Sequence, residues 1–354
     1  MTDASAPTTN ASDDARRRLV AALISALPDP VLIADRNRRI FASNAGAREL
    51  FGIGREGNAL AMSIRTPDVL DAVNRVLDGA ERECVLWGER VPVERLFEVH
   101  VSAFSLDGFR AAVIEFRDLT EARRVERMRV DFIANASHEL RTPLASLLGF
   151  IETLQGPAKN DAAAREQFLG IMRDQARRMA RLVDDLLSLS RIEQNEHVRP
   201  QTPVDLVQIV RHVADTLDPV ARENGVDLTI STPKEAVVAG DRDELIRVAE
   251  NLVENAIKYG AGGTSPHRVS VEVKQNAREM TLAVSDNGPG IAPEHLPRLT
   301  ERFYRVDAPT SRAKGGTGLG LAIVKHIVVR HRGRLTIESA LGAGTKFQVT
   351  LPKA

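Results

Sequence analysis

Apolar residues recur at alternating steps of three and four along two long segments between residues 119 and 196. The positions are Val130, Ile133, Ser137, Leu140, Leu144, Leu147, Ile151 and Leu154, then Phe168, Met172, Gln175, Met179, Leu182, Leu186 and Leu189. This spacing predicts a heptad seam on each of two helices, which meet at Gln155-Gly156-Pro157, with Asp161 as N-cap of the second. One such hairpin cannot bury both of its flanks, so we expect a homodimeric four-helix bundle.

Before this hairpin, the runs of apolar residues are shorter, and helix and strand patterns are mixed. Residues 1–15 contain almost no large apolar group and predict a disordered tail. From residue 16 to 118 short apolar runs predict a small α/β domain with an antiparallel sheet. Its strands are expected at 31–34, 39–43, 81–88, 94–103 and 109–117, with a helix at 44–51.

Residues 197–203 form a polar linker, and residues 204–354 alternate between helix and strand signals. Asp205 with Gln208, and Asp241 with Glu244, have the spacing of a capping box at a helix start. Strands are expected at 226–231, 269–276, 281–286, 334–339 and 345–351. The whole chain is therefore predicted to be a multidomain α+β protein.

Composition excludes some partners. The 48 basic and 48 acidic residues balance, so we expect no direct nucleic acid binding. The longest apolar run, 19–27, is too short to span a bilayer and lacks a cleavage pattern, so no membrane span or signal peptide is predicted. We expect a cytoplasmic chain, which is membrane-associated if a longer parent carries transmembrane helices.

The single cysteine, Cys84, is interpreted as a small buried apolar side chain.

Ser137-His138-Glu139-Leu140-Arg141-Thr142-Pro143 is the first candidate for chemistry. His138 follows a seam position, so it lies at the edge of the buried stripe. A neutral imidazole has a free lone pair for attack on a phosphoryl group, and the neighbouring Glu139 can accept the other ring proton. Thr142, four residues on, faces the same way. An exposed helical histidine without a function is the alternative for this motif alone.

A second cluster lies in the C-terminal region. Asn251 and Asn255 are four apart on a predicted helix, and their amide oxygens suit Mg²⁺ and phosphate. Lys258 adds a positive charge one turn later. Asp286 ends a strand and can accept a hydrogen bond from an amine such as that of adenine. Gly288 and Gly290 let the backbone approach a flat ligand.

Gly315-Gly316-Thr317-Gly318-Leu319-Gly320 precedes an apolar helix and predicts an anion cradle at a helix N-terminus. Arg305, Arg312 and Lys314 add positive charge before it. The loop lacks the ending of a P-loop and no strand directly precedes it. Gly342-Ala343-Gly344-Thr345 is either a second ligand-facing glycine element or a hairpin turn, and the local pattern favours the turn.

These motifs together resemble the two-component sensor histidine kinases. "FIANASHELRTPL" from Phe132 is similar to their H box and "NLVENAIKY" from Asn251 to their N box. "DNGPG" from Asp286, "ERFYRVD" from Glu301 and "GGTGLGLAIVK" from Gly315 are similar to their G1, F and G2 boxes, in the family's order. The resemblance covers residues 119–354 and implies a phosphotransfer domain (119–196) and a Bergerat-type (GHKL) ATP-binding α/β sandwich (204–354).

The resemblance also implies roles for individual residues. His138 is then the phosphoacceptor, Glu139 its general base, and Thr142 the residue that positions water for dephosphorylation. Asn255 corresponds to the Mg²⁺ ligand and Asp286 to the adenine reader. The other nucleotide-contacting positions, including the glycines of the ATP lid, are Asn251, Lys258, Tyr259, Gly288, Gly290, Arg305, Gly316, Thr317, Gly318, Leu319 and Gly320.

Residues 19–118 resemble a PAS domain less specifically, through "LPDPVLIADRNRRIFASNAGARELFG" and the exit "FRDLTEARRVE". We expect a relay module without a cofactor, in which His100 has a structural role. The segments around the H box resemble the phosphate-regulon sensors of α-proteobacteria (PhoR type), which implies a PhoB-like response regulator and phosphate-starvation signalling.

The sequence therefore predicts an ATP-dependent protein-histidine kinase. It would autophosphorylate His138 with ATP and Mg²⁺ and transfer the phosphoryl group to an aspartate of a response regulator, also acting as its phosphatase. Three alternatives remain open at this point: a phosphatase-dominant member, a scaffold-like member, and a Bergerat-fold ATPase without phosphotransfer.

Overall fold

The computed structural model describes residues 8–52, 56–89, 95–106, 108–260, 266–307, 311 and 315–353. Two compact units make up the chain, Met1–Asp131 and Phe132–Ala354. Both contain helices and sheet, as the predicted α+β class requires. Within the described residues, no helix combines the length and apolar character that crossing a membrane needs.

A five-stranded antiparallel sheet forms the centre of the N-terminal unit, in the order β2-β1-β5-β4-β3. Its strands are β1 (Val31–Asp35), β2 (Ile40–Ser43), β3 (Arg82–Glu89), β4 (Arg95–Leu106) and β5 (Phe109–Asp118). All five coincide with predicted strands to within three residues, because each is a short apolar or alternating run bounded by turn residues.

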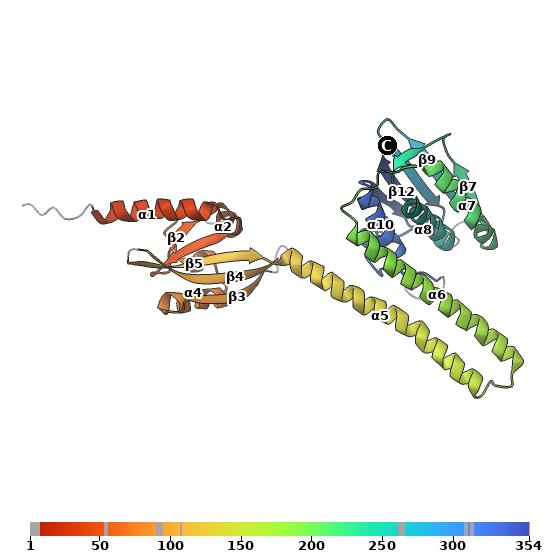
Figure 1. Cartoon of the computed structure of the whole chain (residues 1–354), viewed down its shortest axis with the longest axis horizontal. Helices are drawn as coiled ribbons and strands as arrows, with labels where there is room; N and C mark the ends of the chain where they lie inside the picture. The colour runs from red at the N-terminus through yellow and green to blue at the C-terminus, as the bar shows by residue number, and fades with distance from the viewer. Residues whose placement is uncertain are drawn as a thin grey trace, which may run out of the picture. The chain divides into compact units, whose positions relative to one another are not determined.

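Helices cover both faces of this sheet (Figure 1). One face carries α2 (Ala45–Phe51), α3 (Leu60–Ser63) and α4 (Pro67–Asp78), and the buried residues of α4 recur every three or four positions. The other face carries α1 (Thr8–Ser25), whose Val20 and Ile24 pack against Phe41. Two separate apolar clusters therefore lie on the two sides of one sheet.

The predicted disordered tail is wrong for residues 8–15, because α1 begins at Thr8. Burial of Val20 and Ile24 fixes the C-terminal half of this helix. Once a helix is nucleated, each added residue gains a hydrogen bond, and alanine and arginine are good helix formers. Residues 1–7 lie outside the described part of the chain.

Asn44 joins three elements of the N-terminal unit through its buried side chain. Its Oδ1 accepts hydrogen bonds from the backbone N–H of Val31 and of Ala47, each at 3.0 Å. Its Nδ2 lies 2.7 Å from the carbonyl of Asp29 and 3.3 Å from that of Ile24. The same amide thus caps α2 and holds the end of α1 at the start of β1.

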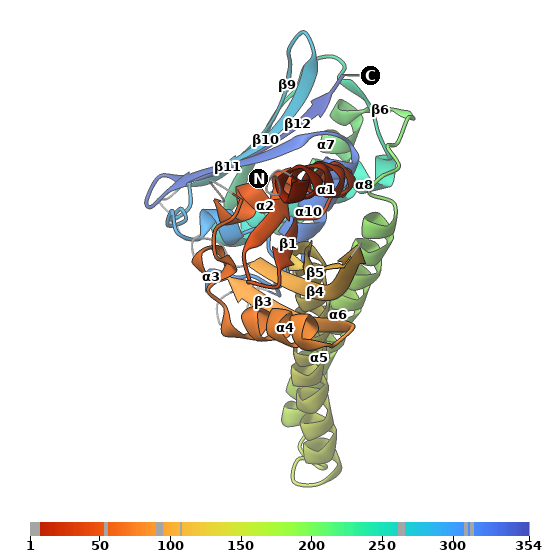
Figure 2. The same cartoon turned by 90° about the vertical axis from the view of Figure 1, so that its left-hand side faces the viewer.

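Two long helices, α5 (Thr120–Gln155) and α6 (Ala162–Gln194), form the predicted hairpin (Figure 2). Asp161 is the N-cap of α6, as predicted, since its Oδ1 accepts from Ala163 N–H and Ala164 N–H at 3.0 and 2.9 Å. Phe150 and Phe168 pack across the hairpin, with ring centroids 5.1 Å apart. Helix α5 continues through Pro143, which is buried.

Only part of the predicted seam is buried within the chain. Leu182, Leu189 and Ile192 on α6 join the core of the C-terminal unit. Other large apolar residues of the hairpin stay exposed, among them Val130, Ile133, Leu144, Leu148, Ile151, Leu169, Val183 and Leu187. This exposed apolar stripe is the surface that a four-helix bundle of two copies would bury.

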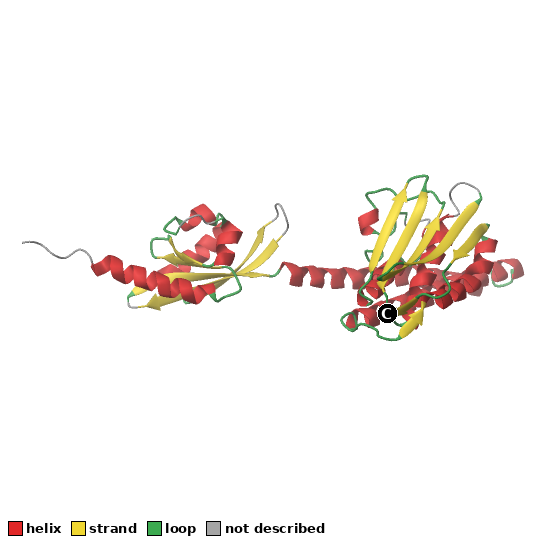
Figure 3. Cartoon of the chain, turned by 90° about the horizontal axis from the view of Figure 1, so that it is seen from above, coloured by secondary structure: helices red, strands yellow, loops and turns green. Residues whose placement is uncertain are grey.

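A second five-stranded sheet, in the order β11-β12-β10-β9-β7, lies over helices in the C-terminal unit (Figure 3). Its strands are β7 (Val226–Ser231), β9 (His267–Gln275), β10 (Glu279–Asp286), β11 (Arg334–Ala340) and β12 (Gly344–Pro352). All five were predicted, and among the described residues β7 and β9 form the only parallel pair of this sheet.

The helices below this sheet are α7 (Leu206–Glu223), α8 (Arg242–Gly260) and α10 (Gly320–Arg330), with a short 3-10 helix at Leu296–Arg298. Asp205 and Asp241 cap α7 and α8, as the capping-box spacing predicted. A two-stranded sheet of β6 (Pro203–Asp205) and β8 (Val237–Ala239) was not predicted, because three residues are too few to show a period. The turn expected at Gly342–Thr345 joins β11 to β12.

We expect Asn44→Ala to lower the free energy of unfolding of the N-terminal unit by about 2–3 kcal/mol, because buried N–H groups lose their acceptor and α2 loses its cap. The single tryptophan, Trp87, lies in this unit, so urea unfolding followed by its fluorescence reports on this unit alone. Asn37→Ala on an exposed turn is the control and should change stability by less than about 0.5 kcal/mol. Equal effects of the two substitutions would show that the Asn44 network contributes nothing.

Candidate functional site

His138 lies on the exposed side of α5 with its ring open to solvent. Its backbone carbonyl accepts a hydrogen bond from the hydroxyl of Thr142, one turn later, at 3.2 Å. Thr142 is also exposed, and so the two predicted residues share one accessible surface of the helix, as their spacing predicted. An incoming group can therefore reach the imidazole from outside.

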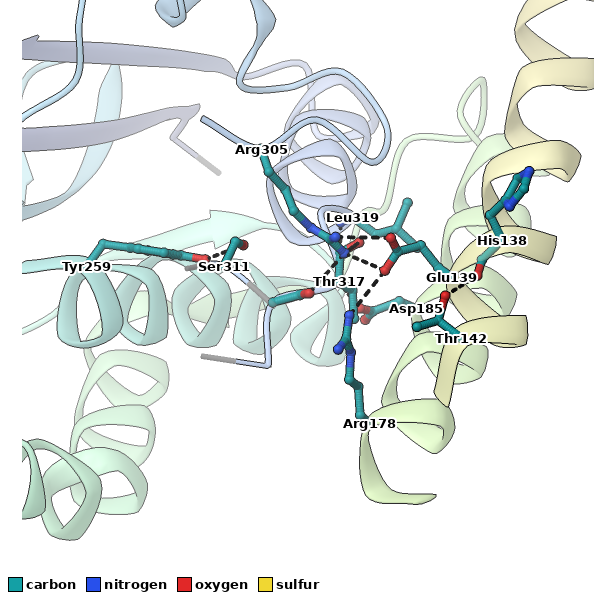
Figure 4. Close-up of polar contacts among 11 residues, drawn as sticks. His138, Glu139, Thr142, Arg178, Asp185, Tyr259, Arg305, Ser311, Thr317 and Leu319 are labelled. Atoms are coloured by element: carbon teal, nitrogen blue, oxygen red, sulfur yellow. Dashed lines mark hydrogen bonds and ion pairs between the residues drawn. The ribbon is translucent and has the colours of Figure 1, made fainter. Parts of the chain in front are cut away.

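Glu139 points away from His138 and into the C-terminal unit (Figure 4). Its two carboxylate oxygens accept a pair of hydrogen bonds from the guanidinium of Arg305, at 3.1 and 2.9 Å. Arg178 of α6 donates to the same carboxylate at 3.2 Å. The Arg305 side chain is only 6% exposed and that of Glu139 17%, so this charged cluster is largely removed from water.

The expected contact of Glu139 with the His138 ring does not occur in this conformation. Neighbouring residues on an α-helix are rotated by about 100° from each other, so their side chains do not face each other. Two arginines hold the Glu139 carboxylate on the inner side instead. Adjacency in the sequence suggested the contact, and helix geometry removes it.

Arg305 also holds the glycine-rich loop that precedes α10. Its Nη2 donates to the carbonyls of Gly316 and Thr317, at 3.0 and 2.8 Å. The predicted phosphate contact of Arg305 is thus replaced here by bonds to the hairpin and to the loop. Arg312 and Lys314, the other predicted cations of this segment, lie outside the described residues.

Asp185 makes a second junction, which joins α6 to the glycine-rich loop and to α8. It accepts hydrogen bonds from the hydroxyl of Thr317 at 2.8 Å and from the guanidinium of Arg247, on α8, at 2.6 Å. Sequence reasoning missed Arg178, Asp185 and Arg247. One feature of the sequence could have indicated Asp185. It lies three residues after Leu182 and four before Leu189, on the buried stripe of α6. An acidic side chain on a buried stripe needs a hydrogen-bonding or charged partner.

Asn251 and Asn255 lie on one side of α8, as their spacing predicted. Asn251 donates from Nδ2 to the carbonyl of Arg247 at 2.8 Å, while its Oδ1 faces the start of α10. A Cβ added to Gly320 would lie 2.3 Å from this Oδ1. Gly320 therefore allows the N-terminus of α10 to approach the asparagine closely.

The other predicted residues of α8 contact their own surroundings. Lys258 forms an ion pair with Glu254, with Nζ 2.5 Å from the carboxylate. The hydroxyl of Tyr259 lies 2.8 Å from that of Ser311, in the segment before the glycine-rich loop (Figure 4). Gly316 packs beside both hydroxyl groups. Tyr259 is thereby linked to the segment that was predicted to form the lid.

Asp286 ends β10 and accepts a hydrogen bond from the N–H of Gly288 at 2.9 Å. Burial raises the pKa of its carboxyl group, against the opposing effect of that hydrogen bond and of one from the backbone of Thr345. The carboxyl group is therefore easier to protonate than that of an exposed aspartate. Its partly buried position suits the recognition of an amine.

Gly288 and Gly290 are required by the packing of the chain itself. A Cβ at Gly290 would lie 2.0 Å from the carbonyl oxygen of Ala340, and one at Gly288 would lie 2.8 Å from Oδ1 of Asp286. The protein's own chain thus occupies the space that the missing side chains leave. The absence of a side chain is required for the chain to pack on itself around Asp286, and the approach of a ligand to these glycines stays a prediction.

Leu319 anchors the glycine-rich loop, because its side chain is fully buried in the core. Gly318 adopts a φ of 75° and packs against the backbone of Phe303. The loop is thus fixed at Leu319, while Gly316 and Thr317 contact Arg305. Leu319 cannot offer its side chain to a ligand in this arrangement.

These groups together fit a nucleotide and its divalent cation. The amide of Asn255 is half-buried and makes no hydrogen bond among the residues that the structure describes. The N-terminus of α10 lies against Asn251, and Asp286 offers a carboxylate. Amide oxygens, backbone N–H groups and a buried carboxylate are suited to Mg²⁺, phosphate and an adenine amine respectively.

Three family models match consecutive parts of the chain. Residues 18–105 match the PAS fold, and residues 128–195 match the His Kinase A (phospho-acceptor) domain. Residues 240–354 match the histidine kinase-, DNA gyrase B-, and HSP90-like ATPase family. These matches bear out the predicted combination of a PAS domain, a helical hairpin and a GHKL ATP-binding domain.

Two relatives are both named sensor protein kinase WalK. The chain is 33% identical to one from Staphylococcus aureus, over 97% of this chain and 82% of that relative. It is 34% identical to the protein of Staphylococcus saprophyticus, over 97% of this chain but 56% of that one, so it spans about half the length of such relatives.

Among solved structures, histidine kinase ThkA in complex with response regulator protein TrrA matches 94% of this chain and 98% of that chain. The TM-score is 0.50 and the identity 21%, which shows a common fold. The three family models and the similarity to a relative over most of its length lead to one assignment: the chain belongs to the two-component sensor histidine kinases.

Proposed function

We propose that this protein uses ATP to phosphorylate its own His138 and then transfers the phosphoryl group to an aspartate of a response regulator. The observation that supports this most strongly is the Glu139–Arg305 pair. It joins the residue next to an accessible histidine to the loop at the start of α10. A histidine and a nucleotide-binding loop thus belong to one compact unit.

In the proposed reaction, a lone pair of the His138 ring attacks the γ-phosphorus of ATP. A nitrogen–phosphorus bond forms while the bond to the bridging oxygen breaks, and ADP leaves with that electron pair. Asn251, Lys258 and the N–H groups at the start of α10 hold phosphate, and Asp286 accepts from the adenine amine. Asn255 would hold Mg²⁺, which neutralises charge on the phosphates.

Arg305 cannot serve the nucleotide and Glu139 with the same donors. In the described conformation its guanidinium is taken by Glu139 and two loop carbonyls. We infer that this arrangement precedes transfer. Binding of ATP phosphates would draw Arg305 away from Glu139, and the freed carboxylate could then turn toward the substrate side of α5 as a general base.

A phosphatase activity on the same regulator is the second proposed function. Thr142 is exposed one turn from His138 and keeps its hydroxyl on that surface, held by the His138 carbonyl. A hydroxyl at this place can position a water molecule against a phosphoaspartate. A Bergerat-fold ATPase of another class does not explain the match to a phospho-acceptor domain at residues 128–195.

The proposed partners are a second copy of the chain, through the exposed apolar stripe of the hairpin, and a response regulator. ThkA was solved in complex with its response regulator protein. A phosphate-regulon regulator of the PhoB type is the narrower proposal from the sequence. The relatives named WalK do not support that pathway specifically, so the regulator has to be identified by transfer rates.

His138→Ala should abolish incorporation of label from γ-labelled ATP into the full chain, because the attacking nitrogen is lost. ATP affinity should be unchanged. The matched control is His212→Ala, an exposed helical histidine on α7, which should label as the unaltered protein does. Label retained on the His138→Ala chain would remove His138 as the phosphoacceptor. The same labelled protein, offered to candidate regulators in turn, identifies the partner by the fastest transfer.

Glu139→Gln and Arg305→Gln should change the affinity for a non-hydrolysable ATP analogue in opposite directions. Glu139→Gln releases Arg305 for phosphate, and we expect binding to tighten roughly three- to tenfold, which corresponds to about 0.7–1.4 kcal/mol. Arg305→Gln should weaken binding. Titration calorimetry measures both, with Glu126→Gln on an exposed part of α5 as control. A shift in the same direction for both variants would contradict competition for Arg305.

Nucleotide affinity should also fall as the pH is lowered. The Asp286 carboxyl group must be ionised to accept from an amine, and burial raises its pKa. Protonation therefore begins at a higher pH than for an exposed aspartate, and affinity is lost as the pH falls through that raised pKa. Asp286→Asn should bind weakly and show a flatter pH profile. An identical profile in both proteins would mean that another group controls the dependence.

A further inference from the structure

Three potential metal ligands gather on the N-terminal sheet, far along the chain from the kinase motifs. Cys84 on β3 lies directly opposite His100 on β4 in the antiparallel register. Glu98 precedes His100 by two residues on the same strand, so it points to the same face. The intervening Val99 is fully buried in the core on the other face.

The three side chains are close enough to share one ion. Their ligand atoms all lie within 4.8 Å of one another, and the Nε2 of His100 is 3.0 Å from a carboxylate oxygen of Glu98. A tetrahedral zinc ion has bonds of about 2.0–2.3 Å, which places its ligands roughly 3.3–3.8 Å apart. Small rotations of these side chains therefore reach that geometry without any change in the strands.

Packing does not explain Cys84. The sequence predicted a small buried apolar group, and that prediction is wrong, because Cys84 is exposed. It is the only cysteine of the chain, so no second thiol of the same chain competes for it. His100 and Glu98 are each partly exposed beside it. The face is open to an ion from solvent.

The local charge also favours a cation. A bound cation stabilises thiolate and carboxylate together, and a thiol ligand releases its proton on binding. Glu115, opposite His100 on β5, adds another acidic residue to the same face.

We propose that Cys84, Glu98 and His100 form a binding site for a borderline transition-metal ion of the Zn²⁺ class. One sulfur, one imidazole nitrogen and one carboxylate oxygen are ligands typical of zinc, whereas Mg²⁺ and Ca²⁺ prefer oxygen alone. The fourth position would be held by water. The site ties β3 to β4, and β4 is the strand whose Leu96 N–H donates to Thr120 at the start of α5.

Cobalt(II) is a suitable probe, because binding to a thiolate gives a sulfur-to-metal charge-transfer absorption that oxygen ligands cannot give. The reduced full-length chain is titrated with Co²⁺, and Zn²⁺ is then added. We expect one Co²⁺ per chain with this absorption, and its loss when Zn²⁺ displaces the ion. The predicted Mg²⁺ ligands around Asn255 cannot produce the signal, since the chain has a single cysteine.

Variants separate a built site from a reactive thiol. Cys84→Ala should remove the absorption, and His100→Gln and Glu98→Gln should each weaken Co²⁺ binding by at least about tenfold. Glu83→Gln, a neighbour of Cys84 that pairs with Arg75, is the control and should bind as the unaltered chain does. Trp87 fluorescence verifies that each variant is folded.

Three results would overturn the proposal. The first is a titration without the charge-transfer absorption. The second is equal affinity in the unaltered, His100→Gln and Glu98→Gln proteins, which would mean that the thiol alone captures the ion. The third is half an ion per chain, which would mean that two copies are bridged through Cys84. None of these results bears on phosphorylation of His138, so the two proposals are tested separately.

Discussion

The paired hydrogen bonds between Glu139 and Arg305 organise the C-terminal unit. They connect residues that are 166 positions apart, and the arginine is almost completely buried. A buried guanidinium needs an anion, and a buried carboxylate needs donors, so neither can be left alone without a large cost in stability. The further bonds of Arg305 to Gly316 and Thr317, and of Asp185 to Thr317, extend this junction to the glycine-rich loop. The helix that carries His138 is therefore held against the loop before α10.

In the proposed competition, the guanidinium of Arg305 has two alternative anionic partners. The C-terminal unit would therefore have two arrangements. Arg305 binds a carboxylate of the hairpin in one, and we infer that it binds phosphate in the other. Both partners are anions, so exchange replaces one charge-assisted contact by another, and the two arrangements can be close in free energy. Arg178 donates to the same carboxylate in the described arrangement. A modest difference in the affinity of Arg305 for its two partners is then enough to shift the population from one arrangement to the other.

Local patterns predicted much of the fold and placed the site residues in the right elements. Both five-stranded sheets, the hairpin and the Asp161 cap follow from periods and turn residues within a few positions of one another. The sequence missed what depends on distant partners or on very short elements. Helix α1 begins before its own apolar pattern does, and β6 and β8 have only three residues each. The choice of Arg305 as the partner of Glu139 is likewise non-local, and so was the solvent-facing position of Cys84.

The start of α5 is fixed by hydrogen bonds to the N-terminal sheet. Thr120 accepts from Leu96 N–H at 3.0 Å and donates from its own N–H to Asp118 at 2.8 Å, while Leu119 N–H donates to the Leu96 carbonyl. From there α5 runs without interruption past His138 to Gln155. Pro143 lacks an N–H, so the carbonyl of Glu139 has no donor four residues on. The backbone bond that Pro143 cannot make is thus the one to Glu139, whose side chain is held by Arg178 and Arg305.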